Sequence, residues 1–143
     1  MISVRGVARA AVVAAVCVAL ASAASAAVNI ETVPVGNPGN AADTRYATPG
    51  YGSVGYAYNI GKYEVTASQY TAFLNAVAKI DTYGLYNTDM SRTDYGSGIT
   101  RSGSSGSYAY SVDPAFVNRP VNYVSWGDSA RFSNWLQIGR AHV

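Results

Sequence analysis

Cysteine and histidine are almost absent from this 143-residue chain, which has one of each. Cys17 lies in an apolar N-terminal run, and His142 is the last residue but one. Residues 27–137 therefore contain neither thiol nor imidazole. This excludes, within that stretch, a disulfide, a Cys/His zinc site, a cysteine nucleophile and a Ser-His-Asp triad. We assign no catalytic, cofactor-binding or metal-binding residue there and infer no particular cofactor.

An excess of basic charge is also missing once the two ends are set aside. The whole chain carries 10 Lys and Arg against 8 Asp and Glu. Arg5 and Arg9 belong to the N-terminal run and Arg140 to the last six residues, so residues 27–137 keep seven basic and eight acidic side chains, a net charge of −1. Because no Lys/Arg cluster occurs among them, we expect no binding to nucleic acid or to anionic lipid.

Long apolar runs occur only near the N-terminus. Arg5 and Arg9 precede an unbroken apolar stretch at 10–21, and two small-x-small triplets follow at 21–23 and 24–26. This pattern is typical of a secretory signal peptide over residues 1–26, cleaved after Ala26. The alternative, a transmembrane anchor, needs about 20 apolar residues. We therefore expect export to the periplasm, the cell surface or the medium, with no integral membrane span in the mature fragment.

The other end of the chain has an unusual sequence. Residues 138–143, Ile-Gly-Arg-Ala-His-Val, are what one reading frame of a common sequencing-library adapter encodes. We expect a non-native tail there; a genuine C-terminus is the alternative. The folded part is then residues 27–137, which we expect to be the first part of a larger domain. Expressed alone, it is expected to be aggregation-prone or partly unfolded, because a partial domain leaves strand edges and an apolar helix face uncovered.

The first half of this stretch has strand and helix signals. Residues 29–35 and 55–60 alternate in polarity and predict strands, with turn residues at 36–40 and a bulge at Gly61. Thr66 and Gln69 form the pattern of a capping box at a helix start. An apolar stripe of core-packing type follows, formed by Tyr70, Phe73, Leu74 and Val77.

Residues 80–118 are rich in Gly, Ser, Thr, Asp and Asn, with tyrosines between them at 83, 86, 95, 108 and 110. Composition alone suggests a disordered linker, but disordered segments are poor in aromatics. We predict a long irregular surface loop held in place by tyrosines, with one strand at 107–112. Calcium prefers oxygen ligands on loops, but the spacing matches no EF-hand and favours solvated polar residues at Asp81, Asn87, Asp89 and Asp94.

A second strand-to-helix unit follows. Residues 120–124 predict an extended run, and Ser125 with Asp128 predicts the start of a helix over 126–136. Two such units suggest two helices packed on one mixed sheet. Glu64 is expected to bond nearby amides or to pair with Arg131. The two Trp side chains, Trp126 and Trp135, suit the seam between sheet and helices.

Two segments carry a family resemblance. Residues 64–74 resemble the "EVTNxQYxxF" signature of the formylglycine-generating enzyme (sulfatase-modifying factor) domain family, with Ala67 in place of Asn. Residues 120–136 resemble its "PVxxVSWxDAxxYxxWL" signature, with Ser129 before the alanine and Phe132 at the aromatic position. Together the resemblance covers 55–137, with 80–118 as an insertion.

The resemblance implies an α+β, C-type-lectin-like fold with short strands, two helices and long irregular loops, truncated here. It also implies, for members that oxidise a sulfatase cysteine, a Cys pair with copper and calcium in the later part of the domain. No residue here matches that pair, so no catalytic position is carried over.

Three functions are compatible with these features. We favour a binding or structural surface module that meets a glycan or a protein through the 80–118 loop, since Tyr, Ser and Gly form many binding surfaces. The alternative is a formylglycine-generating or related oxygen-dependent oxidoreductase whose active-site half is missing. A scaffold role in a surface assembly is the third.

Overall fold

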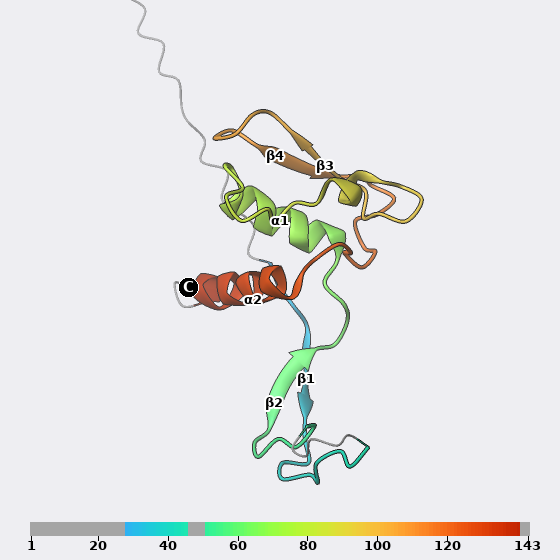
Figure 1. Ribbon diagram of the computed structural model, residues 1–143, viewed down its shortest axis with the longest axis vertical. Helices are drawn as coiled ribbons and strands as arrows, with labels where there is room; N and C mark the ends of the chain where they lie inside the picture. Colours follow the sequence, from blue (N-terminus) through green and yellow to red (C-terminus); the bar gives the residue numbers. More distant parts are fainter. Residues whose placement is uncertain (1–27, 46–50, 141–143) are drawn as a thin grey trace, which may run out of the picture.

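The computed structural model describes residues 28–45 and 51–140. The expected signal peptide lies outside the described residues, as does the end of the expected tail. The described elements (Figure 1) are strands β1, β2, β3 and β4, helices α1 and α2, and a short 3₁₀ helix η1. Their bounds are Thr32–Val35 for β1, Tyr58–Gly61 for β2, Ala67–Val77 for α1, Thr88–Ser91 for η1, Ile99–Ser102 for β3, Ala109–Val112 for β4 and Trp126–Arg140 for α2.

The strands form two separate antiparallel hairpins, β1–β2 and β3–β4. The prediction of one mixed sheet was therefore wrong. The β1–β2 hairpin projects away from the helices, whereas β3–β4 lies beside α1 (Figure 1). The side chain of Asn75 bonds the free edge of β4. Its amide donates to Tyr110 O at 2.8 Å and accepts from Tyr110 N at 2.9 Å, as a neighbouring strand would. Asn75 thus satisfies an edge that would otherwise need a strand partner.

The β1–β2 hairpin is regular at Gly61. Thr32 pairs with Gly61 and Val35 with Tyr58, and the ladder continues through Lys62 N to Glu31 O at 2.8 Å. The bulge predicted at Gly61 was therefore wrong. The alternation breaks there because the chain leaves the hairpin toward α1.

Helix α1 begins at the predicted capping box. Thr66 Oγ1 accepts from Gln69 N at 3.3 Å, and the Gln69 side chain accepts from Thr66 N at 2.9 Å. These two bonds satisfy amides that have no partner inside the helix. The prediction of a helix start at Thr66 is confirmed.

Replacement of Thr66 by alanine is expected to lower the free energy of unfolding by about 1 kcal/mol, the usual effect of losing a hydroxyl cap. Urea denaturation of the two proteins measures the difference. Thr82→Ala is the matched control, because Thr82 is exposed in a loop. An equal effect of the two changes would contradict the capping role.

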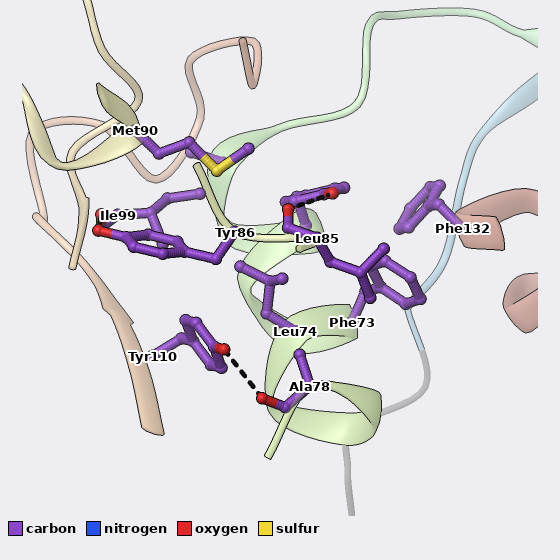
Figure 2. Close-up of a cluster of buried hydrophobic side chains, with 11 residues drawn as sticks. Phe73, Leu74, Ala78, Leu85, Tyr86, Met90, Ile99, Tyr110 and Phe132 are labelled. Atoms are coloured by element: carbon purple, nitrogen blue, oxygen red, sulfur yellow. Dashed lines mark hydrogen bonds between the residues drawn. The ribbon is translucent and has the colours of Figure 1, made fainter. Parts of the chain in front are cut away.

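The core lies where α1 meets the loop elements and α2. Tyr70, Phe73 and Leu74 are at most 1% exposed, as the predicted stripe requires. Val77, the fourth member of that stripe, is 48% exposed, and the next residue, Ala78, is buried instead. The buried cluster (Figure 2) consists of Ala67, Tyr70, Phe73, Leu74, Ala78, Leu85, Tyr86, Met90, Ile99, Tyr110 and Phe132.

Helix α2 begins at a second reciprocal cap. Ser125 Oγ accepts from Asp128 N at 3.2 Å, and Asp128 Oδ2 accepts from Ser125 N at 3.2 Å. Asp128 also places a carboxylate at the positive end of the helix. The predicted start is confirmed, and the helix continues past Leu136 to Arg140.

One aromatic prediction for α2 was wrong. Trp126 is 87% exposed, not buried at a seam. Phe132 and Trp135 form the inner face, with ring centroids each 5.4 Å from that of Phe73. Residue 126 precedes Phe132 by six positions, about 240° around the helix at 3.6 residues per turn. Trp126 therefore cannot share the inner face.

Candidate functional site

Three tyrosine hydroxyls fix the loop over residues 80–118: two join it to α1 and the C-cap of that helix, and one joins two parts of the loop. Tyr70 donates to Leu85 O at 2.9 Å and Tyr86 to Ile99 O at 3.1 Å. The third bond, from Tyr110 to Ala78 O at 2.9 Å, is drawn in Figure 2. Each bond joins a buried ring to a backbone carbonyl. The predicted tyrosine-held loop is confirmed, and it contains β3 and η1 in addition to the predicted strand.

Burial keeps two of these hydroxyls protonated. Loss of solvent raises the pKa of the Tyr70 hydroxyl, and the nearby carboxylates of Asp128 and Asp81 raise it further. Burial also raises the pKa of Tyr110. A phenol must keep its proton to donate a hydrogen bond. Both groups are therefore donors throughout the physiological pH range.

The buried carboxylate of Asp81 fixes the backbone at the start of the loop. Its backbone is left-handed, at φ 57°, and its side chain is only 3% exposed. Its carboxylate accepts from Leu85 N at 2.7 Å and lies 3.3 Å from an Arg101 guanidinium nitrogen. That guanidinium stacks over Tyr86 and Tyr108, 4.9 and 4.4 Å from the ring centres. The expectation of a solvated polar residue was therefore wrong for Asp81, whose buried carboxylate binds the loop backbone and Arg101.

An exposed aromatic cluster stands at the outer edge of the same loop. We call it the aromatic platform and define it as Arg92, Tyr95 and Tyr123. Tyr95 is 52% and Tyr123 38% exposed, with ring centroids 6.4 Å apart. The Arg92 guanidinium lies 4.0 Å above the Tyr95 ring and is fixed by Asp94 through bonds of 3.1 and 2.8 Å. Rings and charges are therefore held together on one surface.

The backbone under the platform is constrained. Asn122 N donates to Ser97 Oγ at 2.9 Å, the Ser97 hydroxyl donates to Asn122 Oδ1, and Asn122 Nδ2 donates to Tyr95 O. Ser97 is fully buried. These bonds tie the two tyrosine-bearing segments to each other.

Tyr123 has a left-handed backbone, at φ 57°. This conformation costs a bulky side chain about 1–2 kcal/mol. Such strain persists where the surroundings impose it and is concentrated at functional sites. Sequence reasoning missed Tyr123 because it lies within a helix-start signature, 28 positions after Tyr95, and nothing in the sequence brings them together.

The predicted Glu64–Arg131 pair does not form. Arg131 Nη1 lies 3.7 Å from Asp128 Oδ1, and its guanidinium stacks over Tyr83 at 4.5 Å. Arg131 therefore contacts Asp128, one turn away on α2, and Tyr83 of the loop instead of Glu64. Glu64 is left exposed beside α2.

The start of α1 pairs through the backbone with the extended segment that precedes α2. Thr66 forms an antiparallel bridge with Pro120. Ala67 N donates to Arg119 O at 2.8 Å, and Val121 N donates to Val65 O at 2.9 Å. The two signature segments therefore join where α1 begins, in the extended run before the Ser125 cap of α2.

Comparison with known families identifies the domain. The model of the sulfatase-modifying factor enzyme 1-like domain matches residues 24–140. The chain belongs to this family. No curated protein and no solved structure matches significantly. Membership implies a C-type-lectin-like fold for this sulfatase-modifying-factor-like domain, and the described α+β arrangement of two helices with two small sheets is in keeping with it.

The described part of this sulfatase-modifying-factor-like domain does not fit the copper or calcium that the family resemblance implies. Over residues 28–45 and 51–140, no three His, Cys, Asp or Glu side chains gather as a metal site. Asn87 accepts from Asp89 N at 2.9 Å, Asp94 pairs with Arg92, and Asp81 is bonded inside the loop. We therefore derive no step through a metal.

The described residues also contain no helix with the length and apolarity to cross a bilayer.

Proposed function

We propose that this sulfatase-modifying-factor-like domain protein is an exported binding module that recognises a glycan or a protein partner through the aromatic platform. The N-terminal charge and apolar pattern support export. The observation that carries the binding proposal is a set of exposed rings fixed over a strained backbone at Tyr123. Rigid tyrosines lose little conformational entropy on binding.

The chemistry of the platform favours a glycan over a protein. Tyrosine faces suit the C–H faces of sugar rings, and the planar Arg92–Asp94 pair offers fixed donors and acceptors to neighbouring hydroxyls. Because the charges of Arg92 and Asp94 offset each other, the platform does not favour a strongly charged ligand. A protein partner remains the other outcome of the experiment.

Replacement of Tyr95 or Tyr123 by alanine is expected to lower partner affinity by about tenfold or more, since aromatic anchors dominate binding surfaces. A glycan array and a peptide array probed with the purified chain measure this, followed by titration of the best hit. Tyr56→Ala is the control, because Tyr56 is 70% exposed but lies near the β1–β2 hairpin. Wild-type binding by both platform variants would contradict the proposal.

Family membership favours a second candidate, a formylglycine-generating or related oxygen-dependent oxidoreductase. Residues 27–137 supply no thiol for such chemistry. The test is to incubate the purified chain with copper, oxygen and a cysteine-containing peptide, and to assay for aldehyde with a hydrazide reagent. Aldehyde above the protein-free control would establish the oxidoreductase.

A further inference from the structure

A groove runs along the flank of α2, and none of the three platform residues lines it. One cavity of about 420 Å³ is lined by Glu64, Val124 and Phe132, among others. An adjoining cavity of about 470 Å³ extends to Leu136 at the far end. The two share Val65, Phe132 and Ser133 and so form one depression, which we call the α2 groove.

The walls of the α2 groove are mainly apolar. Val65, Val121, Val124 and Leu136 are partly buried side chains packed against the core, and Phe132 is 5% exposed. An occupant that covered these walls would remove further apolar surface from water, which is favourable in proportion to the area.

The charged group of the groove and two of its hydroxyls are suited to a donor-rich cation. Glu64 is the one charged residue lining either cavity, and its carboxylate has no ion pair or side-chain hydrogen bond within residues 28–45 and 51–140. The hydroxyls of Ser129 and Ser133 donate to Ser125 O and Ser129 O at 3.0 and 2.9 Å. Because these protons are used, the hydroxyl oxygens remain as acceptors.

The length of the groove indicates a polypeptide. Its lining extends from Ser129 to Gln137 on α2. Eight residues of α-helix span about 12 Å, the length of about four residues of extended chain. A small amine would leave most of this apolar length uncovered.

We propose that the α2 groove binds an extended polypeptide segment in which an arginine side chain pairs with Glu64 and the apolar side chains beside it cover Val65, Phe132 and Leu136. The charge complementarity of a lone carboxylate selects a cation. Arginine fits better than lysine because its planar fork bonds a carboxylate through two parallel contacts. This site is separate from the aromatic platform and does not depend on it.

The test uses two fluorescent, end-capped peptides of sequence Leu-Val-Arg-Val-Leu, one of them with citrulline in place of arginine. Citrulline keeps the shape and removes the charge. Fluorescence anisotropy with the purified wild-type chain is expected to show saturable binding of the arginine peptide, about tenfold or more tighter than that of the citrulline peptide. Glu64→Gln is expected to abolish this preference and leave the affinity for the citrulline peptide unchanged.

Two further variants separate the outcomes. Ser133→Trp, placed where the cavities join, is expected to block both peptides, whereas Asp89→Asn controls for the loss of one exposed negative charge elsewhere. Equal affinity of the wild-type chain for the two peptides, or no saturable binding of either, would overturn the proposal. Self-association of the chain that Ser133→Trp abolishes and the arginine peptide fails to displace would assign the groove to a second copy instead. Because the two peptides are compared on the wild-type chain, the test does not depend on any variant folding.

Discussion

Replacement of Phe73 by alanine is expected to lower the free energy of unfolding by about 3–5 kcal/mol, the usual range for a buried aromatic side chain. Phe73 is 1% exposed and lies between α1 and α2. Its ring centroid is 5.5 Å from that of Tyr70 and 5.4 Å from those of both Phe132 and Trp135. Removal of the ring leaves a cavity that these three large side chains cannot fill without moving the helices.

Urea denaturation followed by tryptophan fluorescence measures the change, since Trp135 contacts the site. Val77→Ala is the matched control on the same helix, because Val77 is 48% exposed. It is expected to change stability by less than about 1 kcal/mol. Comparable losses for the two variants would show that Phe73 does not join the helices.

Replacement of Gly98 by alanine is expected to lower the free energy of unfolding by about 2–5 kcal/mol, the second largest effect. Gly98 has φ +63°, and an added Cβ would lie 2.7 Å from Phe116 Cγ and 3.0 Å from Phe116 Cβ. The left-handed conformation accounts for about 1–2 kcal/mol of the loss and overpacking for about 1–3 kcal/mol. The clash would separate β3 from the segment that leads to the second helix.

Gly84→Ala measures the backbone part of this effect by itself, and the difference between the two variants gives the steric part. Gly84 has nearly the same backbone, at φ +64°, but an added Cβ there meets no atom within 4 Å. Its loss is expected to be about 1–2 kcal/mol, from backbone conformation alone. Thermal and urea unfolding of both variants give the comparison. The packing of Phe116 on Gly98 would be disproved by identical losses.

The helices could be predicted from the sequence because their signals are local. Thr66 with Gln69 and Ser125 with Asp128 form caps within four residues, and an apolar stripe marks the inner face of α1. The sheets could not be predicted, because pairing joins distant residues. β3 was missed since Ile99 is the one apolar residue in Ile99–Ser102, and its partner strand lies beyond a turn rich in Gly and Ser.

The candidate site, too, was predictable only where its signal is local in the sequence. The sequence drew attention to tyrosines in the 80–118 loop, including Tyr95. It gave no sign that Tyr123 lies beside Tyr95, because the link passes through Ser97 and Asn122, two small polar residues common in any loop. Trp126 was misplaced because its size suggests burial, whereas its helix position turns it outward.

The three tyrosine bonds that hold the loop have an evolutionary consequence. Each ends on a main-chain carbonyl, at Leu85, Ile99 or Ala78, and every amino acid carries that acceptor. The bonds therefore do not depend on the identity of the residues that accept them. Substitutions at these three acceptor positions can therefore keep the bonds, provided that the new side chains still pack in the core. In the binding role that we propose, exposed loop residues could then change the recognition surface while the loop stays attached.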